Sequence, residues 1–471
     1  MSLLDRLLIA VVLVSALWWA CSRHRHPAAL QRVSAVALAL AAATVIFDGP
    51  RWQMAPWEAL AVGVGVAAAL RHWRPGRSRR AVRVAGRGAL GVGMFVGAVA
   101  LLTAFVPQLP KPSGSHHVAS QIFRWTDSSR PETLTSDPAD HRQVIAQAWY
   151  PTDTTDGRRV PYFEAQHEMP GSVAGLPSFM YASFGEIDTH ATFDAPVSRT
   201  QRAWPVLVFS PGLGVPREQY TSLSTELASR GFVVIAVSAP YESAPTVLAD
   251  GRVVGQTVHP DVMGPPPHPE LQRLIDMRAA DASFVLDQLA ALPATDPSSP
   301  LTAHLDLGHV GIVGHSLGGA TAVQLLAADP RFKVGVNLDG KLFGAQPDAH
   351  LRQPLLWMQS DDHARTQEYT QGRDRLLAGL RGGGDVITVD GSVHMSFSDA
   401  PSYWTAAGRH LLGNTAGTGS VALAEMTKTT ADAISAFAGP ALGIASAPTM
   451  PNVLAAHASL HAERLVAATG V

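Results

Sequence analysis

The stretch that decides the fold reads VGIVGHSLGGA and spans residues 310–320. Its first residues are β-branched and apolar, which is typical of a short buried strand, and an alanine-rich segment typical of a helix follows. Between them lies Gly-x-Ser-x-Gly, with Ser316 at its centre. On a tight strand-to-helix turn this pattern exposes the serine hydroxyl, and the N-terminus of the helix favours developing negative charge. The stretch therefore predicts that Ser316 is a nucleophile.

On both sides of this stretch, apolar strand patterns alternate with amphipathic helix patterns. We predict strands at 144–150, 206–209, 232–237, 310–313, 334–338, 355–358 and 386–389, and helices at 219–230, 271–289, 320–328 and 422–438. Such alternation predicts an α/β protein whose mostly parallel sheet has helices on both faces. Together with the serine motif, it indicates an α/β-hydrolase fold.

A general base is expected downstream, because the chain order in this fold is serine, then an acid, then histidine. The histidines after Ser316 are His350, His363, His394, His410, His457 and His461. His394 follows the predicted strand 386–389 on a short loop, where a base can reach the serine from the C-terminal end of the sheet. We predict that His394 is the base; the alternative is a loop histidine that faces solvent.

The acid has two candidate positions. Asp339 directly follows the strand 334–338, and Asp361 and Asp362 follow the next strand, 355–358. A carboxylate at either place could hold the imidazole in its productive tautomer. The spacing in the sequence does not decide which of the two positions holds the acid.

The tetrahedral oxyanion needs two backbone N–H donors. One is expected at Leu317, directly after the nucleophile, and the other in the loop 210–214 (SPGLG) after the strand 206–209. Pro211 has no N–H, so we favour Leu213 over Gly214.

The first 106 residues differ sharply from the rest. Apolar stretches lie at 3–21, 28–47, 54–70 and 88–106, each about as long as a helix that crosses a bilayer. We predict a four-helix transmembrane region. The alternatives are a signal peptide followed by buried helices, or a lipoprotein signal at Cys21, which Trp18 and Trp19 fit poorly.

Arginine placement predicts the orientation of these spans. Arginines crowd the loops after the first and third stretches: Arg23, Arg25 and Arg32, then Arg71, Arg74, Arg77, Arg79, Arg80, Arg83 and Arg87. The remaining short loop has only Arg51. The positive-inside rule predicts that both arginine-rich loops lie in the cytoplasm. The chain is then a multi-pass cell-membrane protein, with everything after the fourth span extracytoplasmic.

The rest of the chain divides into three parts. Residues 107–118 begin with the Pro/Ser/Gly-rich run PQLPKPSGS and predict a linker. Residues 119–440 are the predicted catalytic domain, and 441–471 a loosely packed tail. The net charge of −2 gives no reason to expect a nucleic-acid partner, and the single cysteine excludes an intramolecular disulfide.

Several of these segments together resemble the platelet-activating factor acetylhydrolase family, meaning the plasma-type enzyme and its bacterial relatives. The resemblance covers roughly residues 120–400. It rests on the runs WYP at 149–151, PVLVFSPGLG at 205–214, LASRGFVV at 227–234, GHSLGGA at 314–320, LDG at 338–340 and GSVHMSF at 391–397.

The resemblance implies an acid at Asp339, an oxyanion donor at Leu213, and no metal or cofactor. It also implies phospholipid substrates with short or oxidised sn-2 acyl chains. The sequence departs from the family at two places: Pro211 replaces a histidine common in the family, and the segment 239–243 (APYES) replaces a charged one. The second change lies on the pocket side and weakens the substrate assignment.

The sequence thus predicts a membrane-anchored serine esterase whose partners are a small ester or phospholipid and the lipid bilayer. One alternative is another ester hydrolase of the same fold, such as a general carboxylesterase, a lipase or a cutinase-like polyesterase. The second is a non-catalytic membrane protein with a degenerate hydrolase domain.

Overall fold

The computed structural model describes most of the 471 residues in two compact units. The described residues are 1–21, 27–73, 79–166, 172–173, 176–243, 245–258, 268–344, 346, 350–362, 365–413, 415 and 417–466. One unit comprises Met1–Pro107 with the short segments Phe179–Ser183 and Tyr403–Gly408. The other comprises Gln108–Ser178, Phe184–Ser402 and Arg409–Val471.

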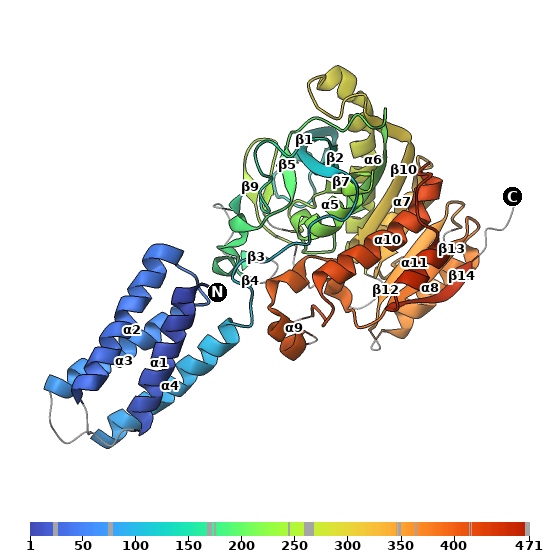
Figure 1. Cartoon of the computed structure of the whole chain (residues 1–471). Coiled ribbons are helices and arrows are strands. Elements are labelled where there is room, and N and C mark those ends of the chain that lie inside the picture. The colour runs from blue at the N-terminus through green and yellow to red at the C-terminus, as the bar shows by residue number, and fades with distance from the viewer. Residues whose placement is uncertain are drawn as a thin grey trace. The chain divides into compact units, whose positions relative to one another are not determined.

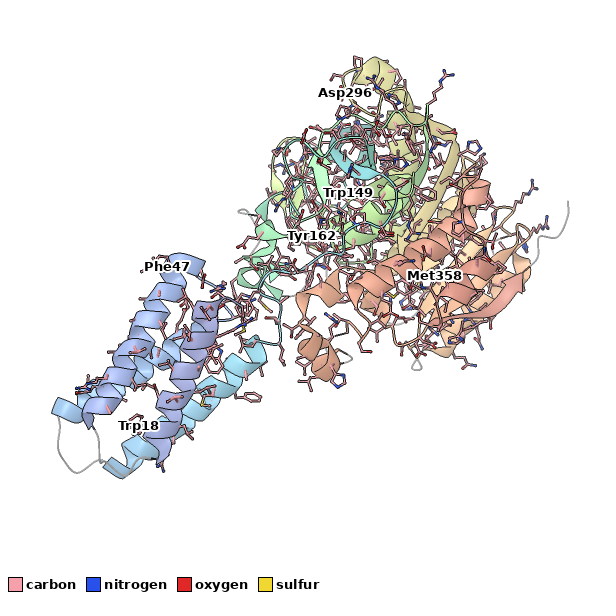
Figure 2. All side chains as sticks on the ribbon, in the orientation of Figure 1. Trp18, Phe47, Trp149, Tyr162, Asp296 and Met358 are labelled. Atoms are coloured by element: carbon pink, nitrogen blue, oxygen red, sulfur yellow. The ribbon has the colours of Figure 1, made fainter. Side chains whose placement is uncertain are left out.

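The first unit is a bundle of four helices (Figure 1): α1 (Leu3–Cys21), α2 (Pro27–Asp48), α3 (Ala55–Trp73) and α4 (Arg79–Ala100). An apolar core that includes Leu8, Ala37 and Trp57 joins the helices. Other large apolar side chains point outward, and Phe47, labelled in Figure 2, is 78% exposed. Among the described residues, only α2 is long and apolar enough to cross a membrane, over Gln31–Asp48. Shorter apolar segments lie at Ala55–Ala69 and Gly86–Ala100.

The fourth helix differs from the prediction of 88–106. It begins nine residues earlier, at Arg79, since the arginine-rich segment contains good helix formers, and it ends at Ala100. Beyond it, Thr103 forms an isolated β-bridge with Trp404, and the Thr405 N–H donates to the carbonyl of Leu102 at 2.8 Å. Of the arginines used to predict orientation, Arg23, Arg25, Arg74 and Arg77 lie outside the described residues.

The second unit is built on one ten-stranded sheet in the order β14-β13-β12-β11-β10-β6-β7-β2-β1-β5. The pairs β1–β2, β2–β7 and β13–β14 are antiparallel, and the others are parallel. The strands are β1 (His117–Pro131), β2 (His141–Thr152), β5 (Ala191–Phe193), β6 (Trp204–Ser210), β7 (Val233–Val237), β10 (Leu305–His315), β11 (Phe332–Leu338), β12 (Leu355–Ser360), β13 (Gly384–Val389) and β14 (Leu460–Val466). The sheet is therefore mostly parallel, as predicted.

Helices cover both faces of this sheet (Figure 1). The longer ones are α5 (Thr221–Ser229), α6 (Pro269–Thr295), α7 (Leu317–Ala328), α8 (Gln367–Gly379) and α10 (Leu423–Ala441). One core joins α6, α7 and α8 to Val208 and Trp357, and the other joins α5 and α10 to Phe209 and Met358. Neighbouring strand residues thus point to opposite faces, each into its own core. Trp149 and Met358 are labelled among these buried side chains in Figure 2.

Shorter elements fill the connections between these strands and helices. They are β3 (Ser172–Val173), β4 (Leu176–Pro177), η2 (Ser178–Tyr181), η3 (Phe184–Glu186), η4 (Arg217–Tyr220), β8 (Thr246–Val247), β9 (Val253–Val254), η7 (His394–Phe397), η8 (Ala400–Tyr403), α9 (Ala406–Leu412) and α11 (Met450–Ala456).

The C-terminal segment is a correction to the sequence prediction, which made 441–471 a loosely packed tail. Residues 450–456 form helix α11, and 460–466 form the edge strand β14, antiparallel to β13. Leu460 and Val453 are buried. The strand escaped prediction because its polar residues, such as Glu463, give it little apolar pattern. Residues 467–471 lie outside the described residues.

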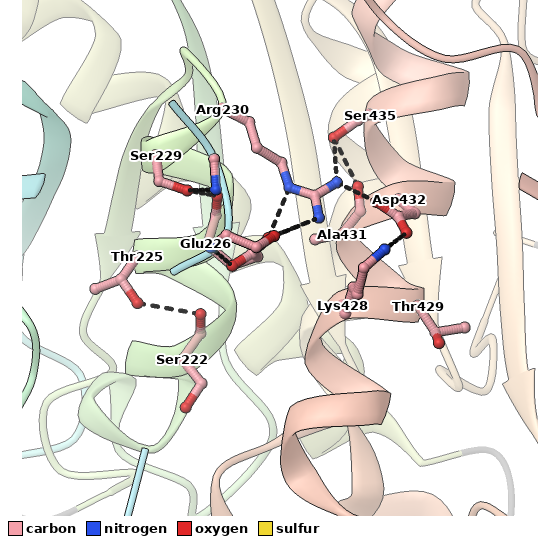
Figure 3. A network of polar contacts seen from close by, with 12 residues as sticks. Ser222, Thr225, Glu226, Ser229, Arg230, Lys428, Thr429, Ala431, Asp432 and Ser435 are labelled. Carbon is pink, nitrogen blue, oxygen red and sulfur yellow. Dashed lines mark hydrogen bonds and ion pairs between the residues drawn. The ribbon is translucent and has the colours of Figure 1, made fainter. Parts of the chain in front are cut away.

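Ion pairs tie α5 to α10 on one face of the sheet (Figure 3). The Arg230 guanidinium pairs with Glu226 at 2.6 Å and with Asp432 at 2.5 Å. Asp432 also binds Lys428 and the His457 imidazole, each at 2.6 Å. The elements η4 and α5 directly follow the turn that carries Leu213. The ion pairs therefore hold the segment after this turn against α10.

Candidate active site

Ser316 lies at the sharp turn between β10 and α7. Its φ and ψ angles are 57° and −120°, a conformation that non-glycine residues rarely adopt. A Cβ atom at Gly314 would overlap the carbonyl of Gly318, and one at Gly318 would overlap the carbonyl of Ser210. Glycine is therefore required on both sides of the serine, which explains the motif in steric terms.

Three predicted site residues come together at the C-terminal edge of the sheet. The Ser316 hydroxyl lies 2.9 Å from Nε2 of His394, and Nδ1 of His394 lies 2.8 Å from Oδ2 of Asp339. His394 begins η7, just after β13, and Asp339 directly follows β11. The His394 side chain is 46% exposed, whereas Asp339 is 7% exposed. Solvent thus reaches the imidazole, while the carboxylate behind it is shielded.

Hydrogen bonds hold Asp339 ionised in this buried place. Burial alone would raise its pKa, but hydrogen bonds from His394 and Ser360, with the positive charge that His394 can carry, lower the pKa to about 2. The Ser360 backbone N–H and hydroxyl donate to it at 3.1 and 2.8 Å. A permanent carboxylate at Nδ1 leaves Nε2 as the nitrogen that faces the serine.

The competing residues lie elsewhere. Asp361 accepts a hydrogen bond from the Gly391 N–H at 3.2 Å, so it supports the loop rather than the imidazole, and Asp362 is exposed. Two of the other histidines are paired with aspartates, His457 with Asp432 and His461 with Asp390. His350 and His410 are exposed, and His363 lies outside the described residues.

The two predicted oxyanion donors belong to segments that lie next to Ser316. Leu317 is the first residue of α7, where backbone N–H groups have no partner within the helix. Leu213 is in the turn after β6, and the preceding Gly212 is so close that a Cβ there would lie 3.4 Å from the Ser316 Cβ. Leu213 packs against an apolar cluster that contains Leu317 and Phe343.

Sequence reasoning missed several polar side chains around this site. Ser360 binds Asp339, and the buried His315 binds the His394 carbonyl at 2.9 Å. Tyr220 binds the Gly212 N–H at 3.0 Å, and Arg278 donates to the carbonyl oxygens of Pro211 and Gly212. Only His315, a neighbour of the serine in the motif, could have been suspected from its position.

Groups of three or more metal-binding side chains do not occur among the described residues.

The sheet, the strand-turn-helix at Ser316 and the order of the site residues along the chain define the α/β-hydrolase class. Within that class, the chain matches the family described as platelet-activating factor acetylhydrolase, isoform II, over residues 107–253 and 295–437. The match covers more than half of the chain, and the protein belongs to this family.

Individual relatives agree with this assignment. The platelet-activating factor acetylhydrolase of Cavia porcellus is 29% identical over 288 residues, which are 55% of this chain and 64% of the relative. A probable 1-alkyl-2-acetylglycerophosphocholine esterase of Arthroderma benhamiae is 24% identical, over 65% of this chain and 80% of the relative. The chain thus spans slightly less than two thirds of the guinea-pig protein.

A solved structure, a ferulic acid esterase from Streptomyces cinnamoneus, is also similar. The TM-score is 0.63 at 26% identity, and the match covers 76% of this chain and 99% of the esterase.

Proposed function

We propose that the protein is a serine esterase that hydrolyses carboxylic esters, with Ser316 as nucleophile, His394 as base and Asp339 as the acid. The observation that carries the proposal is the continuous chain from the Ser316 hydroxyl to His394 Nε2 and from Nδ1 to Asp339, with links of 2.9 and 2.8 Å. A serine held at a positive φ at the end of a central strand supports the same role.

In this proposal, the Ser316 oxygen attacks the ester carbonyl while His394 Nε2 takes its proton. The backbone N–H groups of Leu213 and Leu317 donate to the tetrahedral oxyanion. His394 then protonates the leaving alcohol, and water resolves the acyl-enzyme with His394 again as base. Asp339 holds the ring and stabilises its charged form.

The proposed substrates are phospholipids with short or oxidised sn-2 acyl chains. Family membership supports this class, as do the names of the guinea-pig and fungal relatives.

A second candidate is a carboxylesterase that acts on other small esters. The similarity to a ferulic acid esterase over nearly its whole length favours it. Acyl preference distinguishes the two: a phospholipid hydrolase should prefer sn-2 acetyl over sn-2 palmitoyl substrate and should leave methyl ferulate untouched.

We also propose that the N-terminal unit, residues 1–106, is a four-helix membrane anchor and that the catalytic domain, residues 119–440, is extracytoplasmic. The length and composition of α2 and the apolar segments of α3 and α4 support the anchor.

The test of the proposed chemistry is Ser316→Ala. Hydrolysis of 2-acetyl phospholipid and of p-nitrophenyl acetate should fall by roughly 10⁶-fold, since the nucleophile is lost. Ser298→Ala, at an exposed serine that binds Asp296, is the matched control and should keep full activity. A fluorophosphonate probe should label the wild type and not Ser316→Ala. Undiminished activity in Ser316→Ala, or an unlabelled wild type, would refute the proposal.

A further inference from the structure

Buried polar groups connect the two loops that flank Ser316. The Gly212 N–H donates to the Tyr220 hydroxyl at 3.0 Å, and that hydroxyl lies 2.8 Å from Nδ1 of His315. On the other side of the ring, Nε2 of His315 lies 2.9 Å from the backbone carbonyl of His394. Tyr220 and His315 are fully buried, so solvent does not replace these bonds.

The chemistry of the end groups determines which atom donates and which accepts in each of these hydrogen bonds. The His394 carbonyl can only accept, so His315 Nε2 must carry a hydrogen and donate it. Burial, with the nearby His394, lowers the pKa of His315 to about 3, so its ring is neutral and Nδ1 is a bare acceptor. The Tyr220 hydroxyl therefore donates to Nδ1, and its oxygen accepts from Gly212.

This series of hydrogen bonds ends at two groups that take part in the proposed reaction site. Gly212 immediately precedes Leu213, the proposed oxyanion donor, and His394 is the proposed base. Because the Gly212 N–H is bound to Tyr220, it does not compete with Leu213 for the oxyanion. His315 is also covalently joined to Ser316, so one ring fixes the position of the base relative to the nucleophile.

We infer that Tyr220 and His315 are positioning residues, which hold the oxyanion turn at Gly212 and the backbone of His394 in register around Ser316. The inference rests on the proposed esterase function. The ring nitrogens of His315 bind Tyr220 and the His394 carbonyl rather than the reacting groups, and the His315 ring packs against the His394 ring with centroids 4.6 Å apart. The effect should appear mainly in the transition state, since placement errors of about 1 Å can cost about a hundredfold in rate.

The experiment uses the full-length protein in detergent and compares Tyr220→Phe, His315→Leu, His315→Gln and the double variant Tyr220→Phe/His315→Leu. Rates on p-nitrophenyl acetate are divided by the number of sites that a fluorophosphonate titrates, so unfolded protein does not count. We expect kcat and kcat/KM to fall together by roughly 10- to 100-fold in Tyr220→Phe. Affinity for a trifluoromethyl ketone, which mimics the tetrahedral state, should fall by the same factor.

Tyr150→Phe is the matched control, because its hydroxyl is also buried and donates to the Ala195 carbonyl at 2.9 Å, outside the site. Its rate per titrated site should equal that of the wild type. His315→Gln keeps a donor and an acceptor and should recover part of the loss in His315→Leu. The double variant should lose no more than the worse single variant, because the residues act as one unit.

The inference is overturned if Tyr220→Phe and His315→Leu match Tyr150→Phe per titrated site, or if the ketone binds all variants equally. Losses that multiply in the double variant would also overturn it. Failure of the proposed function looks different: the wild type itself would then hydrolyse no ester, and Ser316 would not react with the probe.

Discussion

At the scale of single residues, the site places two non-glycine side chains in left-handed backbone. Ser316 and Asp339 have φ angles of 57° and 54°. Each such residue costs roughly 1–3 kcal/mol, so the surrounding structure must hold it in place. The Ser316 N–H donates to the Leu338 carbonyl at 2.9 Å, and the Asp339 N–H to the Met358 carbonyl at 2.7 Å. These bonds place Ser316 and Asp339 at the ends of adjacent strands.

The choice between the two candidate acids gives a prediction at this scale. Asp339→Asn should lower kcat on p-nitrophenyl acetate by about 10⁴-fold, because the neutral amide no longer selects the productive imidazole tautomer. Asp361→Asn changes the carboxylate that accepts from the Gly391 N–H, and this variant should stay within a few-fold of the wild type. Steady-state kinetics on both variants checks the assignment. A larger loss of kcat in Asp361→Asn than in Asp339→Asn would identify Asp361 as the acid instead.

At the scale of elements, a buried ion pair supports the turn at Pro211 and Gly212. The Arg278 guanidinium, on α6, lies 2.7 Å from Glu242, and both side chains are almost fully buried. Arg278 also donates to the Pro211 carbonyl. It lies between the two segments that match the family, within the unmatched residues 254–294. The long helix α6 thus supports a turn that comes from a distant part of the chain.

Breaking this pair should lower the stability of the fold. Glu242→Ala should destabilise the fold by about 3–5 kcal/mol, because Arg278 would remain buried without its partner. The exposed pair Arg252–Asp250 is the control, and Asp250→Ala should cost less than about 1 kcal/mol. Urea denaturation measures both. Equal effects would mean that the buried pair contributes no more than a surface one.

A second element contact links the loop after His394 to the start of α5. The Asp399 carboxylate is buried, accepts from the Ser222 N–H at 3.2 Å and from the Tyr162 hydroxyl at 3.1 Å, and its own N–H donates to the Gln219 carbonyl. Burial outweighs these hydrogen bonds and raises the pKa of Asp399 to about 7.

Because this pKa is higher in the folded than in the unfolded chain, the folded state binds the proton more tightly. The stabilisation is complete below pH 4 and is lost as the pH rises to about 7, by up to about 4 kcal/mol. Asp399→Asn should remove that part of the pH dependence. Denaturation midpoints between pH 4 and 8 measure it, with Asp156→Asn, at an exposed residue, as the control. Parallel pH curves for wild type and Asp399→Asn would contradict the prediction.

At the scale of the whole molecule, the chain joins a helical unit to a hydrolase unit. If the first unit is a membrane anchor, the full-length protein should stay in the membrane fraction after alkaline carbonate extraction and dissolve only in detergent. If the hydrolase unit is extracytoplasmic, Asp156→Cys in a Cys21→Ser background should react with a membrane-impermeant maleimide in intact cells. Labelling only after the cells are broken would reverse the proposed orientation.

Local patterns in the sequence determined much of the fold and part of the site. The motif at 310–320 predicted both the sheet class and the position of Ser316, and the strand before His394 predicted its loop. These predictions succeeded because a strand, a tight turn and a helix are each specified by neighbouring residues. The family resemblance is confirmed by the match over 107–253 and 295–437.

Only the tertiary structure placed Asp339 beside the His394 ring and brought Tyr220 and Arg278 to the turn at Gly212. It also added β14, whose polar residues carry little pattern, and moved the start of α4 to Arg79. For the site residues, the physical reason is long-range packing. Both aspartates follow neighbouring parallel strands, and the other contacts join segments tens of residues apart, so only the packing of strand ends and helices sets which side chains meet.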